Sequence, residues 1–481
     1  MKRILFVASE ALPFAASGGL GDVIGSLPAA MRESDPDCDV RVIMPLYDTI
    51  SDGYRSKMKK LFDTRISLSW REQYCGLFSI VENGVTFYFV DNEYYFRRGR
   101  LYGEYDDGER FAFFCKAAVD LLPLIDFFPD IVHAHDWQAA LTVIYLKRMY
   151  GWKAGYSGIK TVFTIHNIQY QGVFGMNILG DVFGIPESQR KIVEFSGDIN
   201  LMKGAIICAD AVTTVSPTYA KEILSPQYSH GLHSVLGLYK GKLSGILNGI
   251  DRVYYNPSRD RELPANYSYR APAGKKICKD TLLETLGLPV RDGVPLLAMI
   301  SRLVSHKGMD IVREAAYDIV GGDVQLVVLG KGDAEYERFF GELAERFPAK
   351  VRTLIKYDKS LSKQIYAAAD IFIMPSLSEP CGLAQMIASR YGAVPVVRET
   401  GGLYDSIRDY GWPGGGNGFT FAPYSGRELC RAVERATALY SDSERWNALV
   451  GKVMRYDFSW KKSAKLYIQM YERLNTPNEQ S

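Results

Sequence analysis

Short, continuous apolar segments recur along the whole chain, and each is followed by a stretch with helical periodicity. Segments without alternating polar residues indicate strands that are covered on both faces, which is typical of parallel sheets flanked by helices. In the first half these segments are Ile4–Ala8, Val40–Met44, Val85–Val90, Ile131–Ala134, Thr161–Ile165, Ala211–Val215 and Leu243–Leu247. In the second half they are Leu296–Ile300, Val324–Leu329, Val351–Ile355, Ile371–Met374, Val394–Val397 and Gly418–Phe421. The alternation predicts an α/β fold with two doubly wound domains rather than a barrel.

A polar, proline-marked segment, Asn256–Pro264, separates the two halves. We therefore predict a first domain over residues 1–250, a linker over 251–264 and a second domain over 265–455. Near the end of the chain, Trp460–Leu474 carries apolar side chains at helical spacing, at Ala464, Tyr467, Ile468 and Tyr471. This stripe predicts a helix that must pack on another element.

Composition narrows the class of protein. The 481 residues are 47% hydrophobic and 23% charged, which is typical of a soluble enzyme large enough for two domains. The formal net charge of +2 gives no reason to expect a nucleic acid or a membrane surface as partner. The seven cysteines are scattered without a C-x-x-C pair, which favours a reducing compartment. Glu10 interrupts the N-terminal apolar segment too early for a signal peptide, so we expect a cytoplasmic protein.

Glycine-containing turns follow several predicted strands. Ser17–Val23 follows the first strand and opens a helix, whose N–H groups and dipole favour a phosphate. An ordinary strand–helix turn explains the same residues equally well. Gly330–Asp333 matches neither a Walker loop nor a dinucleotide fingerprint, and Thr400–Leu403 adds another place for close backbone approach.

Two further loops combine charge with rigid backbone. Ser301–Gly308 places Arg302 and Lys307 at the carboxyl end of a predicted strand, where cations suit a leaving diphosphate. A solvated basic loop is the alternative interpretation. In Pro375–Leu383, Glu379 is bracketed by proline and glycine, as a rigid acceptor for sugar hydroxyls should be. We interpret Cys381 as a small buried residue rather than a nucleophile.

Histidines cluster after two strands of the first half. His133–Gln138 contains an H-x-H pattern, and Thr164–Asn167 contains His166. An H-x-H pair at a strand end suits a metal site, but one of two such histidines is more often satisfied by backbone hydrogen bonds, which is the interpretation we favour.

The order and spacing of these motifs resemble those of bacterial glycogen synthases and plant starch synthases. The motifs are Ser17–Val23, His133–Gln138, Thr164–Gly172, Asn248–Asp251, Ser301–Gly308, Tyr357–Asp358, Pro375–Leu383 and Arg398–Leu403. Each is weak by itself, but the ordered set is specific and covers nearly the whole chain. The resemblance implies a GT-B fold: two Rossmann-like domains face each other across a cleft, and a C-terminal helix over 456–481 crosses back to the first domain.

The resemblance also implies an activity. A retaining glucosyltransferase of this family transfers glucose from ADP-glucose to the non-reducing end of an α-1,4-glucan, such as glycogen or a malto-oligosaccharide. Family enzymes are thought to react at the front face of the sugar, with the departing phosphate taking the proton of the acceptor. No metal or other cofactor is implied, and no Asp-x-Asp pattern accompanies the donor motifs.

Single residues receive roles from the same resemblance. The implied catalytic residues are Asp136, His166, Arg302, Lys307 and Glu379. The implied donor-binding residues are Gly18, Gly19, Asp22, Asn248, Tyr357, Cys381, Gly382, Leu383, Gly402 and Leu403. Arg302 and Lys307 would neutralise the diphosphate, and Glu379 would hold glucose hydroxyls. Asp136 and His166 would lie on the glucose side, with Tyr357 stacked on the adenine.

Three positions depart from the pattern of the family. Ala16 stands where the family usually has a lysine, Ala384 where it has Ser or Thr, and Leu377-Ser378 where it has Arg-Phe. The first two remove a charge and a hydroxyl expected near the diphosphate, and one charged contact is worth about 1.5–3 kcal/mol.

These departures leave alternatives open. One is a GT-B transferase with another donor such as UDP-glucose, or with another acceptor. A second is a catalytically weakened glucan-binding paralogue, although such a protein would have no need for Arg302, Lys307 and Glu379. A phosphorylase would require a pyridoxal-phosphate lysine, for which the sequence offers no convincing motif. We therefore place the synthase first.

Overall fold

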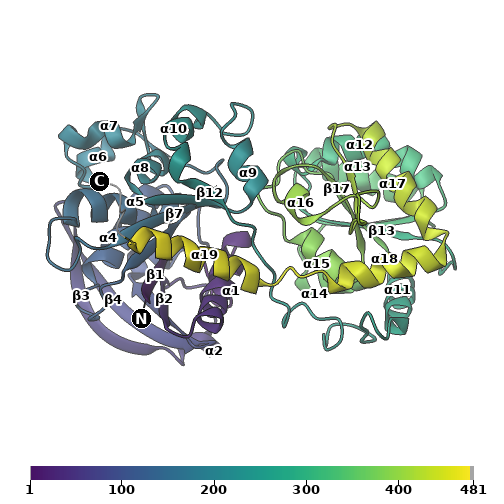
Figure 1. Cartoon of the computed structure of the whole chain (residues 1–481), viewed down its shortest axis with the longest axis horizontal. Helices are drawn as coiled ribbons and strands as arrows, with labels where there is room; N and C mark the ends of the chain where they lie inside the picture. Colours follow the sequence, from purple (N-terminus) through teal and green to yellow (C-terminus); the bar gives the residue numbers. More distant parts are fainter. Residues whose placement is uncertain (1, 477–481) are drawn as a thin grey trace. The chain divides into compact units, whose positions relative to one another are not determined.

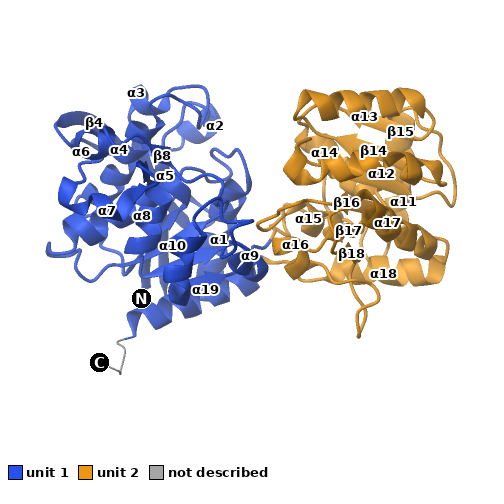
Figure 2. Cartoon of the chain, turned by 90° about the horizontal axis from the view of Figure 1, so that it is seen from above, with its two compact units in different colours: residues 1–249, 460–481 blue, residues 250–459 orange. Residues whose placement is uncertain are grey.

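The structure is a computed structural model that describes residues 2–476, and it divides into two compact units (Figure 2). Unit 1 consists of the chain up to Gly249 together with the segment from Trp460 onward, and unit 2 consists of Ile250–Ser459. Residues 251–264, predicted as a linker, thus belong to unit 2. Asp260 in this segment is buried, forms an ion pair with Lys363 at 3.3 Å and accepts a hydrogen bond from Tyr391. The buried polar contacts of Asp260 tie this segment to unit 2, so it is not a free connection.

Unit 1 is built on a nine-stranded sheet in the order β12-β11-β7-β6-β1-β2-β5-β4-β3 (Figure 1). Its strands are β1 (Lys2–Val7), β2 (Cys38–Pro45), β3 (Lys59–Leu68), β4 (Arg71–Glu82), β5 (Val85–Asp91), β6 (Ile131–His135), β7 (Lys160–Ile165), β11 (Ala211–Thr214) and β12 (Leu243–Gly245). Neighbouring strands are parallel from β12 to β5, so their carboxyl ends lie at one edge. The strand order reverses between β1 and β6, which is where open α/β sheets bind ligands.

The antiparallel hairpin of β3 and β4 was not among the predicted strands. Its side chains alternate: Ile66 and Leu68 are buried, whereas Arg65 and Ser67 are exposed. A search for continuous apolar segments overlooks such a strand, because only one of its faces packs on the protein. The alternation of period two was the signal that would have revealed it.

Helices cover the sheet of unit 1, and a small second sheet lies beside it. The helices are α1 (Gly19–Ser34), α2 (Asp52–Arg55), α3 (Glu93–Phe96), α4 (Asp107–Asp120), α5 (Asp136–Tyr145), α6 (Ile178–Asp181), α7 (Arg190–Val193), α8 (Leu201–Cys208), α9 (Pro217–Glu222) and α10 (His233–Leu238), with a π-helical turn at Leu146–Tyr150. The small sheet is formed by β8 (Val173–Phe174), β10 (Asp198–Asn200) and β9 (Glu194–Phe195).

The terminal helix α19 (Trp460–Asn475) belongs to unit 1 and packs against α1 (Figure 1). The predicted stripe of Ala464, Tyr467, Ile468 and Tyr471 is buried. Burying this apolar face stabilises the return of the chain to its first unit.

Unit 2 holds a six-stranded parallel sheet in the order β15-β14-β13-β16-β17-β18. Its strands are β13 (Leu296–Ile300), β14 (Gln325–Leu329), β15 (Val351–Leu354), β16 (Ile371–Met374), β17 (Val394–Arg398) and β18 (Phe419–Phe421). Consecutive residues of β14, β16 and β17 are buried, so both faces of the sheet are covered. The covering helices are α11 (Ala273–Thr285), α12 (Met309–Gly321), α13 (Ala334–Arg346), α14 (Lys359–Ala368), α15 (Ala384–Arg390), α16 (Gly401–Ser406), α17 (Gly426–Tyr440) and α18 (Ser443–Arg455). The strand order reverses between β13 and β16.

Both sheets are thus doubly wound, as predicted, in agreement with the two Rossmann-like domains expected of a GT-B fold. Within residues 2–476, no helix combines the length and the apolar character needed to cross a membrane.

Candidate active site

In unit 1, the predicted residues gather at the strand-order reversal. The loop that carries Gly18 follows β1, Asp136 follows β6, and His166 follows β7. Because these three parallel strands are neighbours in the sheet, their carboxyl ends bring the motifs together although the motifs lie far apart in the sequence.

Asp136 occupies an unusual backbone conformation, with φ at 56°. Its Oδ1 accepts a hydrogen bond of 2.8 Å from the backbone N–H of His166. Burial raises the pKa of the Asp136 carboxyl to about 7, while the amides of His166 and Asn167 oppose that rise. Functional sites often contain a non-glycine residue at positive φ, and they often contain a carboxyl group whose pKa is shifted; Asp136 combines both features.

His166 and His135 form a buried pair. Their rings face each other with His135 Nδ1 at 2.9 Å from His166 Nε2. Burial lowers the pKa of His166 to about 3 and that of His135 well below its usual range. Both imidazoles are therefore neutral at physiological pH, so His166 can offer a fixed hydrogen bond but no positive charge.

His133, the other member of the H-x-H pattern, has both ring nitrogens occupied. Nδ1 lies 2.6 Å from the hydroxyl of Tyr471 on α19, and Nε2 lies 2.5 Å from Thr164 Oγ1. His133 is therefore satisfied within the protein, but by the hydroxyls of two side chains rather than by the backbone hydrogen bonds expected from the sequence. Over residues 2–476, no group of three or more His, Cys, Asp or Glu side chains is arranged to hold a metal ion.

The glycine loop after β1 is held by Glu10. This buried carboxylate accepts hydrogen bonds from Ser17 N at 2.7 Å, Ser17 Oγ at 2.6 Å, Gly18 N at 3.2 Å and the hydroxyl of Tyr102 at 2.6 Å. Two of the amides expected to face a phosphate are thus bonded to an anion of the chain itself. Sequence reasoning missed Glu10 and Tyr102. A carboxylate directly after a buried strand was the available signal.

The structure places the remaining first-half residues as follows. Gly19 begins α1, and Asp22 lies in the first turn of this helix. Asn248 follows β12 at the same edge of the sheet. It is buried, and its Oδ1 has no hydrogen-bond partner among the described residues. A buried carbonyl oxygen without a donor is costly, so this atom is well suited to accept a hydrogen bond from a ligand.

In unit 2, the two predicted loops meet at the reversal between β13 and β16. Lys307, from the loop after β13, donates a hydrogen bond of 2.6 Å to Glu379 Oε2, from the loop after β16. Ser376 Oγ donates to the same oxygen at 3.0 Å. The Lys307 and Glu379 side chains are 17% and 8% exposed, so this is a largely desolvated ion pair at a strand-end crevice.

Glycines allow these loops to approach each other. Gly308 has φ at 82°, and a Cβ there would lie 2.3 Å from the Pro375 carbonyl oxygen. A Cβ at Gly402 would lie 2.1 Å from the Cys381 carbonyl oxygen, and Gly402 N donates to the Glu379 carbonyl at 3.0 Å. The backbone of Cys381–Leu383 and Gly402–Leu403 is therefore assembled next to Glu379. Cys381 itself is buried.

Arg302 and Tyr357 lie at the same edge of the sheet but are more open. Arg302 is exposed, and its guanidinium lies 3.3 Å from His306 Nε2. Burial, together with Lys307 and Arg302, lowers the pKa of His306, so this imidazole adds no charge. Tyr357 is 88% exposed on the connection between β15 and α14, where its ring is accessible for stacking. The structure thus brings Lys307 and Glu379 into contact, whereas Tyr357 stands two strands from β13.

The second glycine turn of unit 2 has a packing role. A Cβ at Gly330 would lie 1.9 Å from the Ser301 carbonyl oxygen, and one at Gly332 would lie 2.1 Å from that of Leu303. These glycines are required because two strand-end loops run side by side. Their presence therefore gives no support to a site for a nucleoside triphosphate or a dinucleotide.

Comparisons with known proteins identify the relatives of this arrangement. The family described as "Starch synthase catalytic domain" matches residues 3–237, and "Glycosyl transferases group 1" matches residues 287–448. Glycogen synthases of Geobacillus thermodenitrificans and Desulforamulus reducens are 45% and 46% identical to the chain, each over 98% of both proteins. The catalytic domain of starch synthase IV from Arabidopsis thaliana, solved bound to ADP and acarbose, matches with a TM-score of 0.91 and 37% identity over 98% of this chain and 99% of that one.

Proposed function

Because the chain belongs to the glycogen synthase and starch synthase family of glycosyltransferases, we propose that it transfers glucose from ADP-glucose to the non-reducing end of an α-1,4-glucan with retention of the anomeric configuration. The observation that carries the proposal is the contact of Lys307 with Glu379. It places a cation suited to a departing diphosphate beside a carboxylate suited to sugar hydroxyls. The presence of ADP in the starch synthase IV structure supports an adenosine diphosphate donor.

The reaction exchanges one bond for another at the anomeric carbon. The bond from this carbon to the diphosphate oxygen breaks, the acceptor hydroxyl oxygen forms the new bond on the same face, and the acceptor proton passes to the departing phosphate. Lys307 and Arg302 stabilise the negative charge that develops on the leaving group. Ionised Asp136 stabilises the positive charge that develops on the sugar ring, and Glu379 fixes its hydroxyls.

We propose that this chemistry needs no metal ion, because the described residues provide two cations for the diphosphate and no Asp-x-Asp pattern accompanies the donor motifs. The test is extension of maltotriose with ADP-glucose in excess EDTA, followed by NMR of the new anomeric proton. We expect most of the activity to remain and the new linkage to be α. A β linkage would contradict retention, and a complete loss of activity that Mg²⁺ restores would contradict the metal-free mechanism.

The missing lysine at position 16 gives a second test of the donor site. Ala16 is exposed beside the Glu10-bound loop. The arginines of the neighbouring loop are each paired with a carboxylate: Arg97 with Glu93, Arg98 with Asp106 and Arg100 with Glu104. We expect Ala16→Lys to lower the KM for ADP-glucose about tenfold, because a charge-assisted contact is worth about 1.5–3 kcal/mol.

Calorimetric titration of ADP-glucose into the variant and the wild type measures this gain. Ala16→Met is the matched control, since it adds similar bulk without charge. An unchanged or weakened affinity in Ala16→Lys would show that the diphosphate does not approach this loop, or that Glu10 captures the new ammonium.

A further inference from the structure

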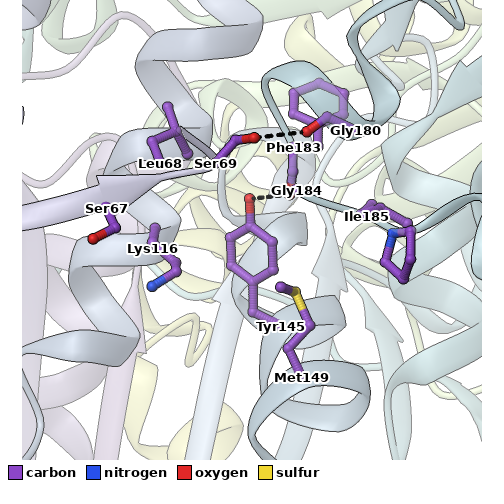
Figure 3. Close-up of a pocket in the computed structure, with 11 residues that line it drawn as sticks. Ser67, Leu68, Ser69, Lys116, Tyr145, Met149, Gly180, Phe183, Gly184 and Ile185 are labelled. Carbon is purple, nitrogen blue, oxygen red and sulfur yellow. Dashed lines mark hydrogen bonds between the residues drawn. The ribbon is translucent and has the colours of Figure 1, made fainter. Parts of the chain in front are cut away.

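A pocket of about 500 Å³ in unit 1 is lined by hydroxyl groups that already have partners within the chain (Figure 3). Ser69 Oγ donates to the Gly180 carbonyl at 3.0 Å. Tyr145 OH donates to the Phe183 carbonyl at the same distance. Packing alone explains hydroxyls that are satisfied in this way. In unit 2, by contrast, the Nε of Arg398 is buried and has no hydrogen-bond partner among the described residues.

Arg398 is a buried cation without a paired carboxylate. It is the last residue of β17 and is only 9% exposed. Its Nη1 donates to the carbonyl of Leu377 at 2.7 Å and to that of Ser376 at 3.4 Å. Within residues 2–476, no carboxylate forms an ion pair with it. Burial of a charge against carbonyl groups alone is costly, and an apolar residue of similar volume is often as stable, so packing does not explain the arginine.

The two carbonyls belong to the loop that carries Glu379. Ser376 and Leu377 precede this glutamate after β16, and Ser376 Oγ also donates to Glu379 Oε2 at 3.0 Å. The guanidinium therefore holds the backbone from which the carboxylate projects. The N–H of Leu377 in turn donates to the carbonyl of His306 at 3.0 Å, which joins this loop to the one that carries Lys307.

The same guanidinium also reaches the loop of Lys307 through Tyr424. Its Cζ lies 5.3 Å from the centroid of the Tyr424 ring. The hydroxyl of this tyrosine donates to Asp310 in the first turn of α12, and its oxygen lies 3.4 Å from the carbonyl oxygen of Ser305. Ser305 begins the 3₁₀ turn that ends at Lys307. One buried side chain thus contacts the supports of both loops.

We propose that Arg398 is a positioning residue for glucosyl transfer, which fixes the loops of Lys307 and Glu379 relative to each other. The inference rests on the proposed function, which assigns the cation to the leaving diphosphate and the carboxylate to the sugar. A displacement of about 1 Å in either loop can reduce the rate about 100-fold. A guanidinium suits this task because its planar group can donate along one edge and stack on a ring with its face.

Hydrogen–deuterium exchange of the full chain tests this positioning without any substrate. In Arg398→Met, we expect the amides of residues 301–308 and 375–383 to exchange about tenfold faster or more, because the contacts that restrain both loops are lost. Arg352→Met is the matched control. Arg352 on β15 likewise donates to backbone carbonyls and, within the described chain, to no carboxylate. Its loss should leave exchange in the two loops unchanged.

Steady-state kinetics with ADP-glucose and glycogen tests the link to catalysis. Arg398→Met should lower kcat about tenfold or more and leave the KM for glycogen within about twofold of the wild type. In a Lys307→Ala background the same change should cost less than about threefold, because a positioning residue acts through the groups that it holds. Arg398→Lys keeps the charge and one donor for Leu377, so it should regain part of the lost kcat.

A milder variant tests the contact through the ring. Tyr424→Phe keeps the stacking surface and removes only the hydroxyl, so it is expected to fold and to speed exchange about threefold or more in residues 301–308. Unchanged exchange in both Arg398→Met and Tyr424→Phe would overturn the inference. An additive loss of kcat in the double variant, or an equal loss in Arg352→Met, would do the same. If the wild type transfers no glucose, the proposed function fails, while exchange still decides whether Arg398 holds the loops.

Discussion

We expect turnover to fall about 100-fold or more when Lys307 or Arg302 is replaced by alanine, because removal of one group that stabilises a developing charge typically costs that much. The loss should appear in kcat at saturating ADP-glucose and glycogen, since the charge on the leaving group develops in the transition state. Near-wild-type turnover in both variants would show that these cations do not hold the diphosphate.

The Lys307→Ala variant needs a control for folding. Glu379 is buried, and removal of its partner leaves an uncompensated carboxylate, which is destabilising. Lys307→Arg keeps the charge, and Arg313→Ala removes an exposed cation of α12 that pairs with Glu335. The thermal unfolding temperature of each variant shows whether a loss of activity is caused by unfolding or by the loss of a catalytic group. We expect Arg313→Ala to match the wild type in both.

Asp136→Asn should also reduce kcat about 100-fold or more, because it removes a negative charge from the sugar side while keeping the shape of the side chain. Asparagine tolerates positive φ and can still accept the His166 amide, so the backbone should be preserved. Measurement of kcat with ADP-glucose and glycogen gives the result. Activity within a few-fold of the wild type would remove Asp136 from the catalytic groups.

The same variant has a stability signature with a definite sign. The pKa of Asp136 rises from its ordinary 3.8 to about 7 on folding, because the carboxylate is desolvated and Glu10 is near. Between these pH values the folded protein keeps a proton that the unfolded chain has lost, so this contribution to stability declines as pH rises from about 4 to 7 and is then constant. Asp136→Asn lacks this titration. Its unfolding temperature, relative to the wild type, should therefore rise from pH 5 to pH 8, whereas a constant difference would contradict the shifted pKa.

Much of the fold follows from the apolar pattern, because continuous segments such as Leu296–Ile300 become strands buried on both faces. The hairpin of β3 and β4 escaped this test, since its buried and exposed residues alternate. The small sheet of β8, β9 and β10 also escaped, because strands of two or three residues leave no measurable pattern.

The positions of the site motifs were predictable for a related reason. Parallel strands share one edge for their carboxyl ends, so motifs that follow strands must assemble there. The partners of these motifs were not predictable. Glu10 reaches Tyr102, and His133 reaches Tyr471, across 92 and 338 positions of the chain. Contacts between residues so far apart in the chain depend on tertiary packing, and no local pattern in a single sequence predicts them.

The central claim concerns the donor, and one comparison tests it most directly. The wild-type enzyme is given ADP-glucose or UDP-glucose with the same glycogen, and kcat/KM is measured for each donor. The account predicts that ADP-glucose is preferred by about tenfold or more, since the site must discriminate between the two nucleotides by contacts to the base. Equal or better transfer from UDP-glucose, or no transfer from either donor, would contradict it.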